Sequence, residues 1–158
     1  MQVKEGQGIM KLLAIVMIRG TAKAPHVVRD TLEMLGLKEP NNCVFLPDSP
    51  GFMGMLKLCK DHVTWGEVSQ KVLEVSLKRW ARVGSRRPTE DEWKKAGSWS
   101  GVSKHLAEGK TLRGLGFNKT LRLHPPRGGY KSVKRPFNAG GDLGNRGDKV
   151  NQLLEKMI

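Results

Sequence analysis

The residues with the most evident binding chemistry lie between Lys110 and Pro136, a stretch that contains many basic side chains and no aspartate or glutamate. Without a nearby acid these cations cannot be neutralised locally, so we expect an external polyanion, most commonly a phosphate backbone, to balance them. A solvated basic loop without a dedicated partner is the alternative interpretation. The basic residues of the stretch are Lys110, Arg113, Lys119, Arg122, Arg127, Lys131, Lys134 and Arg135.

The other residue types of this stretch suit folded RNA. Its glycines let the backbone approach phosphates closely, and its prolines hold the chain extended without helical hydrogen bonds. The arginines can bridge phosphates with two hydrogen bonds, whereas the lysines act as point charges. His124 and Tyr130, together with Phe137 just after the stretch, can stack on unpaired bases. A helix-turn-helix DNA reader would need a compact helical module, and that pattern is absent.

Charge is distributed unevenly along the chain of 158 residues, which carries a formal net charge of +13 and is 38% hydrophobic. Residues 1–69 contain eight Lys and Arg against seven Asp and Glu, whereas residues 70–158 contain twenty against eight. This asymmetry predicts an ordinary folded front part and a cationic binding part. We expect a lead-in over residues 1–8, a folded core over residues 9–68 and a basic extension over residues 69–158.

The front part has the pattern of an α+β domain with the order β-α-β-α-β. Continuous apolar residues predict a buried strand over Met10–Ile18, and two shorter strands are expected over Val44–Leu46 and Val63–Val68. Helical spacing of apolar residues predicts one helix between Pro25 and Gly36 and a second from Phe52 onward. Both helices should cover one side of a three-stranded sheet.

The rear part is predicted to begin and end with helices. A helix from Ser69 leads into an acid-free run of cations, and we expect this run to contact nucleic acid; complementation of the helix dipole is the alternative for part of it. The run comprises Lys78, Arg79, Arg82, Arg86 and Arg87. Thr89 and Glu92 form a capping box, so the acids around Glu92 are expected to start a helix rather than to act as a catalytic pair. A terminal helix presents apolar residues from Val150 to Met157 on one face and should dock on the rest of the protein.

Several sequence motifs suggest catalysis or cofactor binding, but each lacks a residue or a spacing that the chemistry requires. Glu108-Gly109-Lys110-Thr111 resembles the end of a P-loop, but Lys104 occupies the position where that motif needs glycine. The histidines and cysteines do not have metal-ligand spacing. We therefore expect no enzyme activity, cofactor, metal or small-molecule substrate. Cys43 and Cys59 are expected to be buried reduced thiols, and no apolar run is long enough to cross a membrane.

Taken together, several motifs resemble the family of the thirtieth large-subunit ribosomal protein, in the long form shared by archaea and eukaryotes. The resemblance covers about residues 9–158. It implies a ferredoxin-like core with a three-stranded antiparallel sheet and two helices, followed by the basic extension. The matching motifs are Ile18-Arg19-Gly20, Val28-Arg29-Asp30-Thr31-Leu32, Gly54-Met55-Leu56, Lys60-Asp61-His62-Val63-Thr64-Trp65-Gly66-Glu67, Leu121-Arg122-Leu123-His124-Pro125-Pro126-Arg127-Gly128-Gly129-Tyr130 and Gly140-Gly141-Asp142-Leu143-Gly144-Asn145-Arg146-Gly147.

The resemblance further implies a non-catalytic structural role on large-subunit rRNA, near the 5S rRNA and beside neighbouring ribosomal proteins, in the cytoplasmic ribosome. It makes Arg19, Lys23, Arg29, Lys57 and Lys60 candidates for rRNA contact, with solvated surface charge as the alternative. An RNA-binding or RNA-chaperone protein outside the ribosome is the second functional hypothesis. An enzyme acting on RNA is the third.

Overall fold

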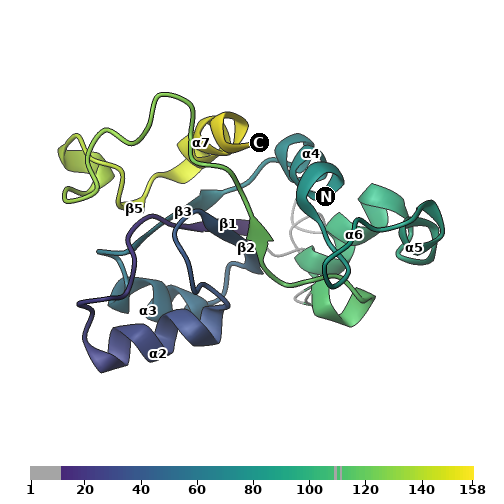
Figure 1. Ribbon diagram of the computed structural model, residues 1–158, viewed down its shortest axis with the longest axis horizontal. Coiled ribbons are helices and arrows are strands. Elements are labelled where there is room, and N and C mark those ends of the chain that lie inside the picture. The colour runs from purple at the N-terminus through teal and green to yellow at the C-terminus, as the bar shows by residue number, and fades with distance from the viewer. Residues whose placement is uncertain (1–11, 109, 111) are drawn as a thin grey trace, which may run out of the picture.

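The computed structural model describes residues 12–108, 110 and 112–158, so the predicted lead-in over residues 1–8 lies outside the described residues. Its centre is an antiparallel arrangement in which β1 (Leu12–Met17) lies between β2 (Asn42–Pro47) and β3 (Val63–Glu67). Every residue of β1 is buried, because helices cover both faces of the sheet (Figure 1). The predicted buried central strand is confirmed over these residues.

One face of the sheet is covered by α2 (His26–Leu35) and α3 (Pro50–Leu58). Their apolar residues pack with Leu13, Ile15 and Met17, the alternate residues of β1 that point to this face. The α2 helix ends at Gly36, whose backbone is left-handed with φ of 86°, a conformation that glycine adopts without steric cost. The α+β class and the order β-α-β-α-β are therefore confirmed.

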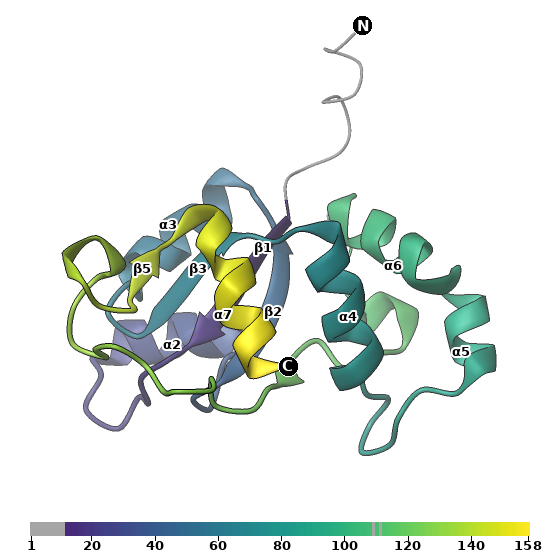
Figure 2. The ribbon, with the colours of Figure 1, turned by 90° about the horizontal axis from the view of Figure 1, so that it is seen from above.

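The opposite face of the sheet is covered by residues of the rear part (Figure 2). Three helices, α4 (Gln70–Trp80), α6 (Ser98–Ala107) and α7 (Val150–Met157), contribute to a second apolar cluster that includes Ala14 and Val16 of β1. The terminal helix buries Val150, Leu153, Leu154 and Met157, as predicted. Within the described ranges, no helix is both long enough and apolar enough to span a lipid bilayer.

A short helix, α5 (Glu90–Lys95), lies beyond α6 and begins with the predicted capping box. The backbone N–H of Glu92 donates to the Thr89 hydroxyl, and the Glu92 carboxylate accepts from the backbone N–H of Thr89 at 2.8 Å. These two bonds satisfy donors that would otherwise lack partners at the helix start. The interpretation of these acids as residues of a helix N-terminus is confirmed.

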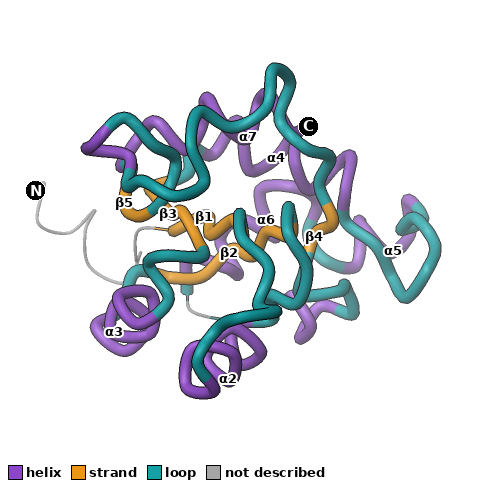
Figure 3. The backbone as a smooth tube through the Cα atoms, turned by 60° about the vertical axis from the view of Figure 1, so that its left-hand side comes forward, coloured by secondary structure: helices purple, strands orange, loops and turns teal. Residues whose placement is uncertain are grey.

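The sheet has five strands in the order β4-β2-β1-β3-β5 (Figure 3), so the predicted three-stranded sheet is wrong in strand number. At one edge β4 (Leu121–Arg122) pairs antiparallel with β2, and at the other edge β5 (Gly144–Asn145) pairs parallel with β3. Two-residue strands have no periodic pattern that a sequence could reveal. Both additions cover exposed edges of the central strands, where unpaired N–H and C=O groups would otherwise remain.

Gly66, in the interior of β3, lets the rear part lie directly on the sheet. A Cβ atom at this position would overlap the carbonyl oxygen of Gly147, which begins the turn η3 (Gly147–Lys149) before α7. The neighbouring Trp65 carbonyl accepts a hydrogen bond from the backbone N–H of Arg146 at 2.9 Å. A glycine within a strand often marks such a close backbone approach.

The two cysteines are buried free thiols, as predicted. Burial raises the pKa of the Cys43 thiol far above its ordinary value and raises the pKa of Cys59 to about 11. Both side chains therefore stay protonated at neutral pH and act as small apolar residues of the two core clusters.

Candidate nucleic-acid interface

The basic stretch crosses one end of the sheet, from the β4 edge to the β5 edge. This end is where β1 finishes and where β2 and β3 begin, because Val16 pairs with Cys43 and Met17 pairs with Val63. The segment after β4 follows this end of the molecule in Figure 2, where it is green, and reaches β5 in Figure 3, where it is drawn as a teal loop. A path along one end of a rigid sheet fixes the spacing of the exposed cations that the segment carries.

Arg122 is held by the pairing of β4 with β2. Leu121 and Leu123 on either side of it are buried, and Arg122 itself, opposite Asn42 in the ladder, is exposed. The Thr120 hydroxyl adds a hydrogen bond of 2.6 Å to the Gly36 carbonyl oxygen. The alternation of apolar and charged residues therefore anchors the backbone and directs the guanidinium outward.

Arg122 lines a broad groove of about 1090 Å³ between the C-terminal end of α2 and the rear part of the chain. The groove lining includes acidic Glu33 and Glu39, but cations outnumber them. Two regions remote in sequence thus supply the walls of one positively charged groove. Its basic residues are Lys38, Arg82, Arg113, Lys119 and Arg122.

Lys119 is partly buried in the wall of this groove. Its ammonium group donates to the Met34 carbonyl oxygen at 3.3 Å. Burial, and secondly the positive charge of Arg113, lower the pKa of Lys119 below its ordinary value. A bound anion would relieve both effects, because it would restore the solvation lost on burial and offset the repulsion between the two cations.

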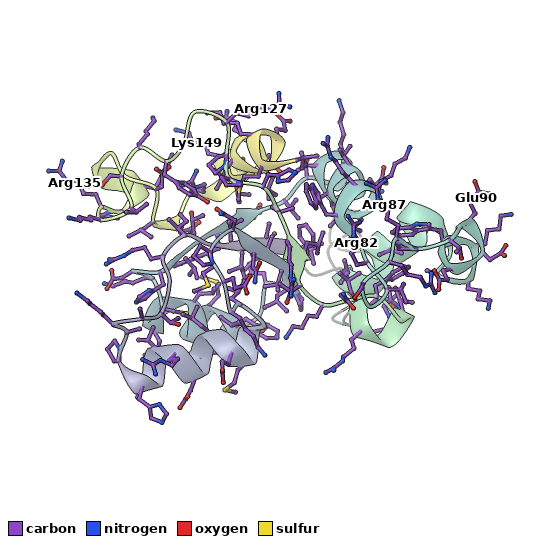
Figure 4. All side chains as sticks on the ribbon, in the orientation of Figure 1. Arg82, Arg87, Glu90, Arg127, Arg135 and Lys149 are labelled. Atoms are coloured by element: carbon purple, nitrogen blue, oxygen red, sulfur yellow. The ribbon has the colours of Figure 1, made fainter. Side chains whose placement is uncertain are left out.

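Two anchors hold the loop that follows β4. The Tyr130 hydroxyl donates to the Asn41 side-chain oxygen at 2.7 Å. The Asp142 carboxylate accepts from the backbone N–H groups of Lys131 and Ser132, the latter at 3.1 Å. Arg127, Lys131, Lys134 and Arg135 are exposed on this anchored loop, and Arg127 and Arg135 lie along the upper edge of the molecule in Figure 4.

The Asp142 carboxylate also forms an ion pair with a buried arginine, Arg146. Arg146 and Asp142 are only 8% and 6% exposed, and their side chains form an ion pair of 3.1 Å. Arg146 also donates to the Thr64 hydroxyl at 2.9 Å and to the Asp142 backbone oxygen at 2.7 Å. Arg146 is therefore an internal structural cation, and the Asp142 charge is already neutralised within the fold.

Two of the three residues predicted to stack on bases, His124 and Tyr130, occupy different environments. His124 is exposed and stands edge-on against the Trp80 ring, with ring centroids 4.6 Å apart. Tyr130 is half-buried, and burial, followed by the negative charge of Asp142, raises its pKa to about 12. His124 therefore offers an accessible ring next to the groove that Trp80 lines, whereas Tyr130 has an evident role in anchoring the loop.

Two of the predicted cations have acidic partners within the chain. Arg86 forms two hydrogen bonds with the Glu92 carboxylate, at 2.6 and 3.0 Å. The bond from Arg86 is the main cause of the lowered Glu92 pKa of about 2, and the Thr89 backbone N–H contributes next. Lys110 lies 3.2 Å from Glu108 on the exposed surface. Glu108 lies just outside the basic stretch, so Lys110 has an acidic partner that the stretch itself does not supply.

The remaining candidates are exposed, and the described part of the chain contains no acidic partner for them. Ile18 and Arg19 donate their backbone N–H groups to the His62 carbonyl oxygen, which brings the loop after β1 beside the turn that follows α3. Arg29 folds back over its loop, with Nη2 at 3.5 Å from the carbonyl oxygens of Thr21 and Ala24. These exposed residues are Arg19, Lys23, Arg29, Lys57, Lys60 and Arg87.

The structure also brings in Lys38, a cation that the sequence did not single out. Lys38 and Arg82 line the groove with Arg113, Lys119 and Arg122. Arg82 belongs to the acid-free run at the end of α4, for which the sequence predicts nucleic-acid contact. Lys38 follows the end of α2 in an otherwise balanced part of the chain, so only the three-dimensional fold reveals its place in the groove.

Fold and charge together define a class: an α+β protein whose sheet supports a cationic surface suited to polyanions. A family model described as Ribosomal protein L30p/L7e matches residues 13–63.

Three relatives are each named large ribosomal subunit protein uL30. The Methanoregula boonei protein is 42% identical over 153 residues, covering 92% of this chain and 99% of its own. The Staphylothermus marinus protein is 42% identical over 159 residues, with 93% and 98% covered. The Methanoculleus marisnigri protein is 39% identical over 152 residues, with 92% and 99% covered.

The chain therefore belongs to the L30p/L7e family of ribosomal proteins, which confirms the resemblance found in the sequence. The relatives match over nearly their whole length, so the likeness includes the basic rear part as well as the core. Among the described residues, no group of three His, Cys, Asp or Glu side chains is placed to hold a metal ion.

Proposed function

We propose that this protein is a structural, non-catalytic constituent of the large ribosomal subunit in the cytoplasm, where it binds large-subunit rRNA near the 5S rRNA and contacts neighbouring ribosomal proteins. Residues 9–68 serve as the core, and the basic extension over residues 69–158 supplies most of the RNA contacts. The family assignment supports the ribosomal setting, because the relatives named above are large-subunit proteins.

The observation that carries the RNA-binding role is the anchored line of cations across one end of the sheet. Arg122, Arg127, Lys131 and Arg135 are exposed, while their backbone segment is fixed by β4, Tyr130 and Asp142. Preorganised cations lose little conformational freedom when they meet phosphates, so this arrangement favours a shaped RNA surface over transient contact. The groove beside α2 extends the same surface to Lys119 and Arg113.

The test replaces Arg122 and Arg127 together with alanine and measures binding to large-subunit rRNA across a salt series. We expect affinity to fall about tenfold or more, because charge-assisted bonds to phosphates are lost. We also expect the dependence of binding on salt to become shallower by roughly one unit per lost phosphate contact. Thermal unfolding should not change, because both side chains are exposed and their neighbouring leucines hold the strand.

The matched control replaces Lys71 and Lys95 with alanine, which removes the same charge from exposed positions on α4 and α5. This variant should keep rRNA affinity within about twofold. Equal losses in both double variants would indicate that net charge alone governs binding and would contradict the proposed surface. A flat salt response in the natural protein would indicate a protein partner instead.

Sedimentation separates the ribosomal proposal from the second candidate, an RNA-binding or RNA-chaperone protein outside the ribosome. A structural constituent should co-migrate with large subunits after a high-salt wash, whereas a free RNA-binding protein should stay in the supernatant. Cross-linking on the assembled subunit, followed by identification of the linked RNA, then tests the position. Links confined to RNA remote from the 5S rRNA would contradict that part of the proposal.

A further inference from the structure

A second, smaller hollow lies between the terminal helix α7 and the anchored basic loop, with a volume of about 330 Å³. Three lysines line it: Lys131 from the loop, Lys149 from the turn η3 and Lys156 from α7. Gln152 of α7 adds an amide that can donate hydrogen bonds. The two walls are joined by a backbone hydrogen bond of 3.2 Å from Arg127 to the Lys156 carbonyl oxygen.

The charges in this hollow do not cancel. Asp142 is the acid in its lining, and both carboxylate oxygens are already used, one by Arg146 and the other by two backbone N–H groups. Asp142 and Arg146 therefore form a neutral unit, and the three lysine charges remain. In the described part of the chain, none of these lysines has an acidic side chain within ion-pair distance.

The aromatic wall of the hollow positions one of these charges. The Lys149 ammonium group lies 5.2 Å from the centre of the Phe137 ring, and the Arg146 guanidinium lies 5.0 Å from the same ring. Two cations share this ring, so Phe137 is better placed to orient Lys149 than to stack on a base. Lysine ammonium groups act as point charges, which suits the tetrahedral oxygens of a phosphate.

We propose that Lys131, Lys149 and Lys156 form a phosphate-binding site that holds a backbone phosphodiester of the bound RNA. The proposal deepens the function proposed above and rests on it. RNA is favoured because the hollow is continuous with the basic loop: Lys131 of that loop lines it, and Lys149 is labelled between Arg135 and Arg127 in Figure 4. One RNA strand that follows the loop would therefore meet the terminal helix, which gives α7 a binding role in addition to packing.

The experiment uses the full chain with Lys149→Gln and Lys156→Gln combined, and measures affinity for large-subunit rRNA across a salt series. We expect about a tenfold loss of affinity at moderate salt and a salt dependence shallower by roughly one unit, as for the loss of one phosphate contact. The Lys149→Arg and Lys156→Arg double variant keeps the charges and should retain most of the affinity. Lys71→Gln with Lys95→Gln is the matched control and should bind as the natural protein does.

Each result decides the proposal. Unchanged affinity and unchanged salt dependence in the Lys149 and Lys156 variant would overturn the site while leaving the proposed function intact. Failure of the natural protein to bind rRNA would instead overturn the proposed function and the site with it. If the double variant lowers the melting temperature, the single Lys149→Gln and Lys131→Gln variants replace it, because both side chains are exposed.

Two further arms separate the sources of the anion. Inorganic phosphate is titrated into the natural protein, with side-chain NMR signals of the lysines as the readout. Saturable binding of inorganic phosphate combined with normal rRNA affinity of the double variant would assign the hollow to free phosphate and reject the RNA contact. The double variant could instead bind rRNA normally while its assembled subunit loses a neighbouring ribosomal protein. That result would assign the hollow to an acidic protein surface and would also reject the proposal.

Discussion

The Asp142 carboxylate connects three parts of the chain that are remote in sequence. It pairs with Arg146, which reaches the Thr64 hydroxyl of β3, and it accepts the backbone N–H groups that begin the Lys131 segment. A buried ion pair adds little net stability by itself, because desolvation offsets its attraction. Its role is to fix where the basic loop lies, since both partners have several well-defined bonds.

We predict that Asp142→Asn destabilises the protein by roughly 3–5 kcal/mol, the usual cost of leaving a buried charge without its partner. Asparagine preserves the size of the side chain, so the loss of stability reports the removal of the negative charge that pairs with Arg146. Urea unfolding measures the effect. Asp61→Asn is the control, because Asp61 is exposed in a turn, and it should change stability by less than about 0.5 kcal/mol. Equal stability of both variants would contradict a role for the buried pair.

At the residue scale, the sequence located the cations but not the acidic side chains that pair with some of them. It identified Arg113, Lys119 and Arg122 as candidates, and the fold gathers them in one groove. It did not reveal that Glu92 serves both as a helix-capping residue and as the partner of Arg86, because the capping box alone explains a glutamate at that position. Of the lysines in the smaller hollow, the sequence singled out Lys131 but not Lys149 or Lys156, because α7 meets the loop only through long-range packing.

At the element scale, glycines decide how closely the segments of the fold approach each other. Gly66 in β3 leaves space for the Gly147 carbonyl, so the turn before α7 rests against the sheet. Gly54 in α3 has open space around its Cα and a helical backbone. A methyl group added at Gly66 would therefore collide with backbone, whereas one added at Gly54 would not.

We predict that Gly66→Ala destabilises the protein by about 1–3 kcal/mol, the usual cost of overpacking, because the added methyl must displace backbone. Gly54→Ala should instead stabilise it by about 0.5–1 kcal/mol, since alanine has the higher helix propensity. Thermal unfolding of the two single variants provides the measurement. A neutral or stabilising effect of Gly66→Ala would show that the contact between β3 and the turn is not tight.

The elements that the sequence predicted well are those with local signals. Both helices of the core, the capping box of α5 and the apolar face of α7 have periodicity or end signals that span several residues. β4 and β5 have only two residues each and depend on pairing with β2 and β3. Their existence follows from the path of the chain across the sheet, which local sequence does not encode.

At the scale of the whole molecule, the sheet separates two apolar clusters and contributes residues to both. One cluster combines β1 to β3 with α2 and α3, and the other combines β1 and β2 with the rear part of the chain. Ala14, Val16, Cys43 and Phe45 face the rear part and are almost fully buried. The charge asymmetry of the sequence therefore predicts a division of roles, whereas the packing joins both parts in one body.

This packing makes a specific prediction for a fragment of residues 1–68. Removal of the rear part exposes the face that contains Val16 and Phe45, and the loss of burial costs roughly 25 cal/mol for each Å² of apolar surface. We expect the fragment to bind a hydrophobic dye and to unfold at lower urea concentration than the full chain, because one cluster alone must then hold the sheet. It should also lose rRNA binding, since Arg122, Arg127 and the lysines beside α7 are removed.

The control for this fragment is the full chain with Arg122→Ala and Arg127→Ala, which weakens RNA binding without removing the second cluster. That variant should bind no more dye than the natural protein and should unfold at the same urea concentration. If the fragment matches the full chain in stability and leaves the dye free, residues 1–68 form an independent domain, and the second cluster serves only to attach the basic extension. If the fragment is destabilised as expected, the extension is part of the fold, and its RNA-binding loop derives its fixed geometry from the same packing.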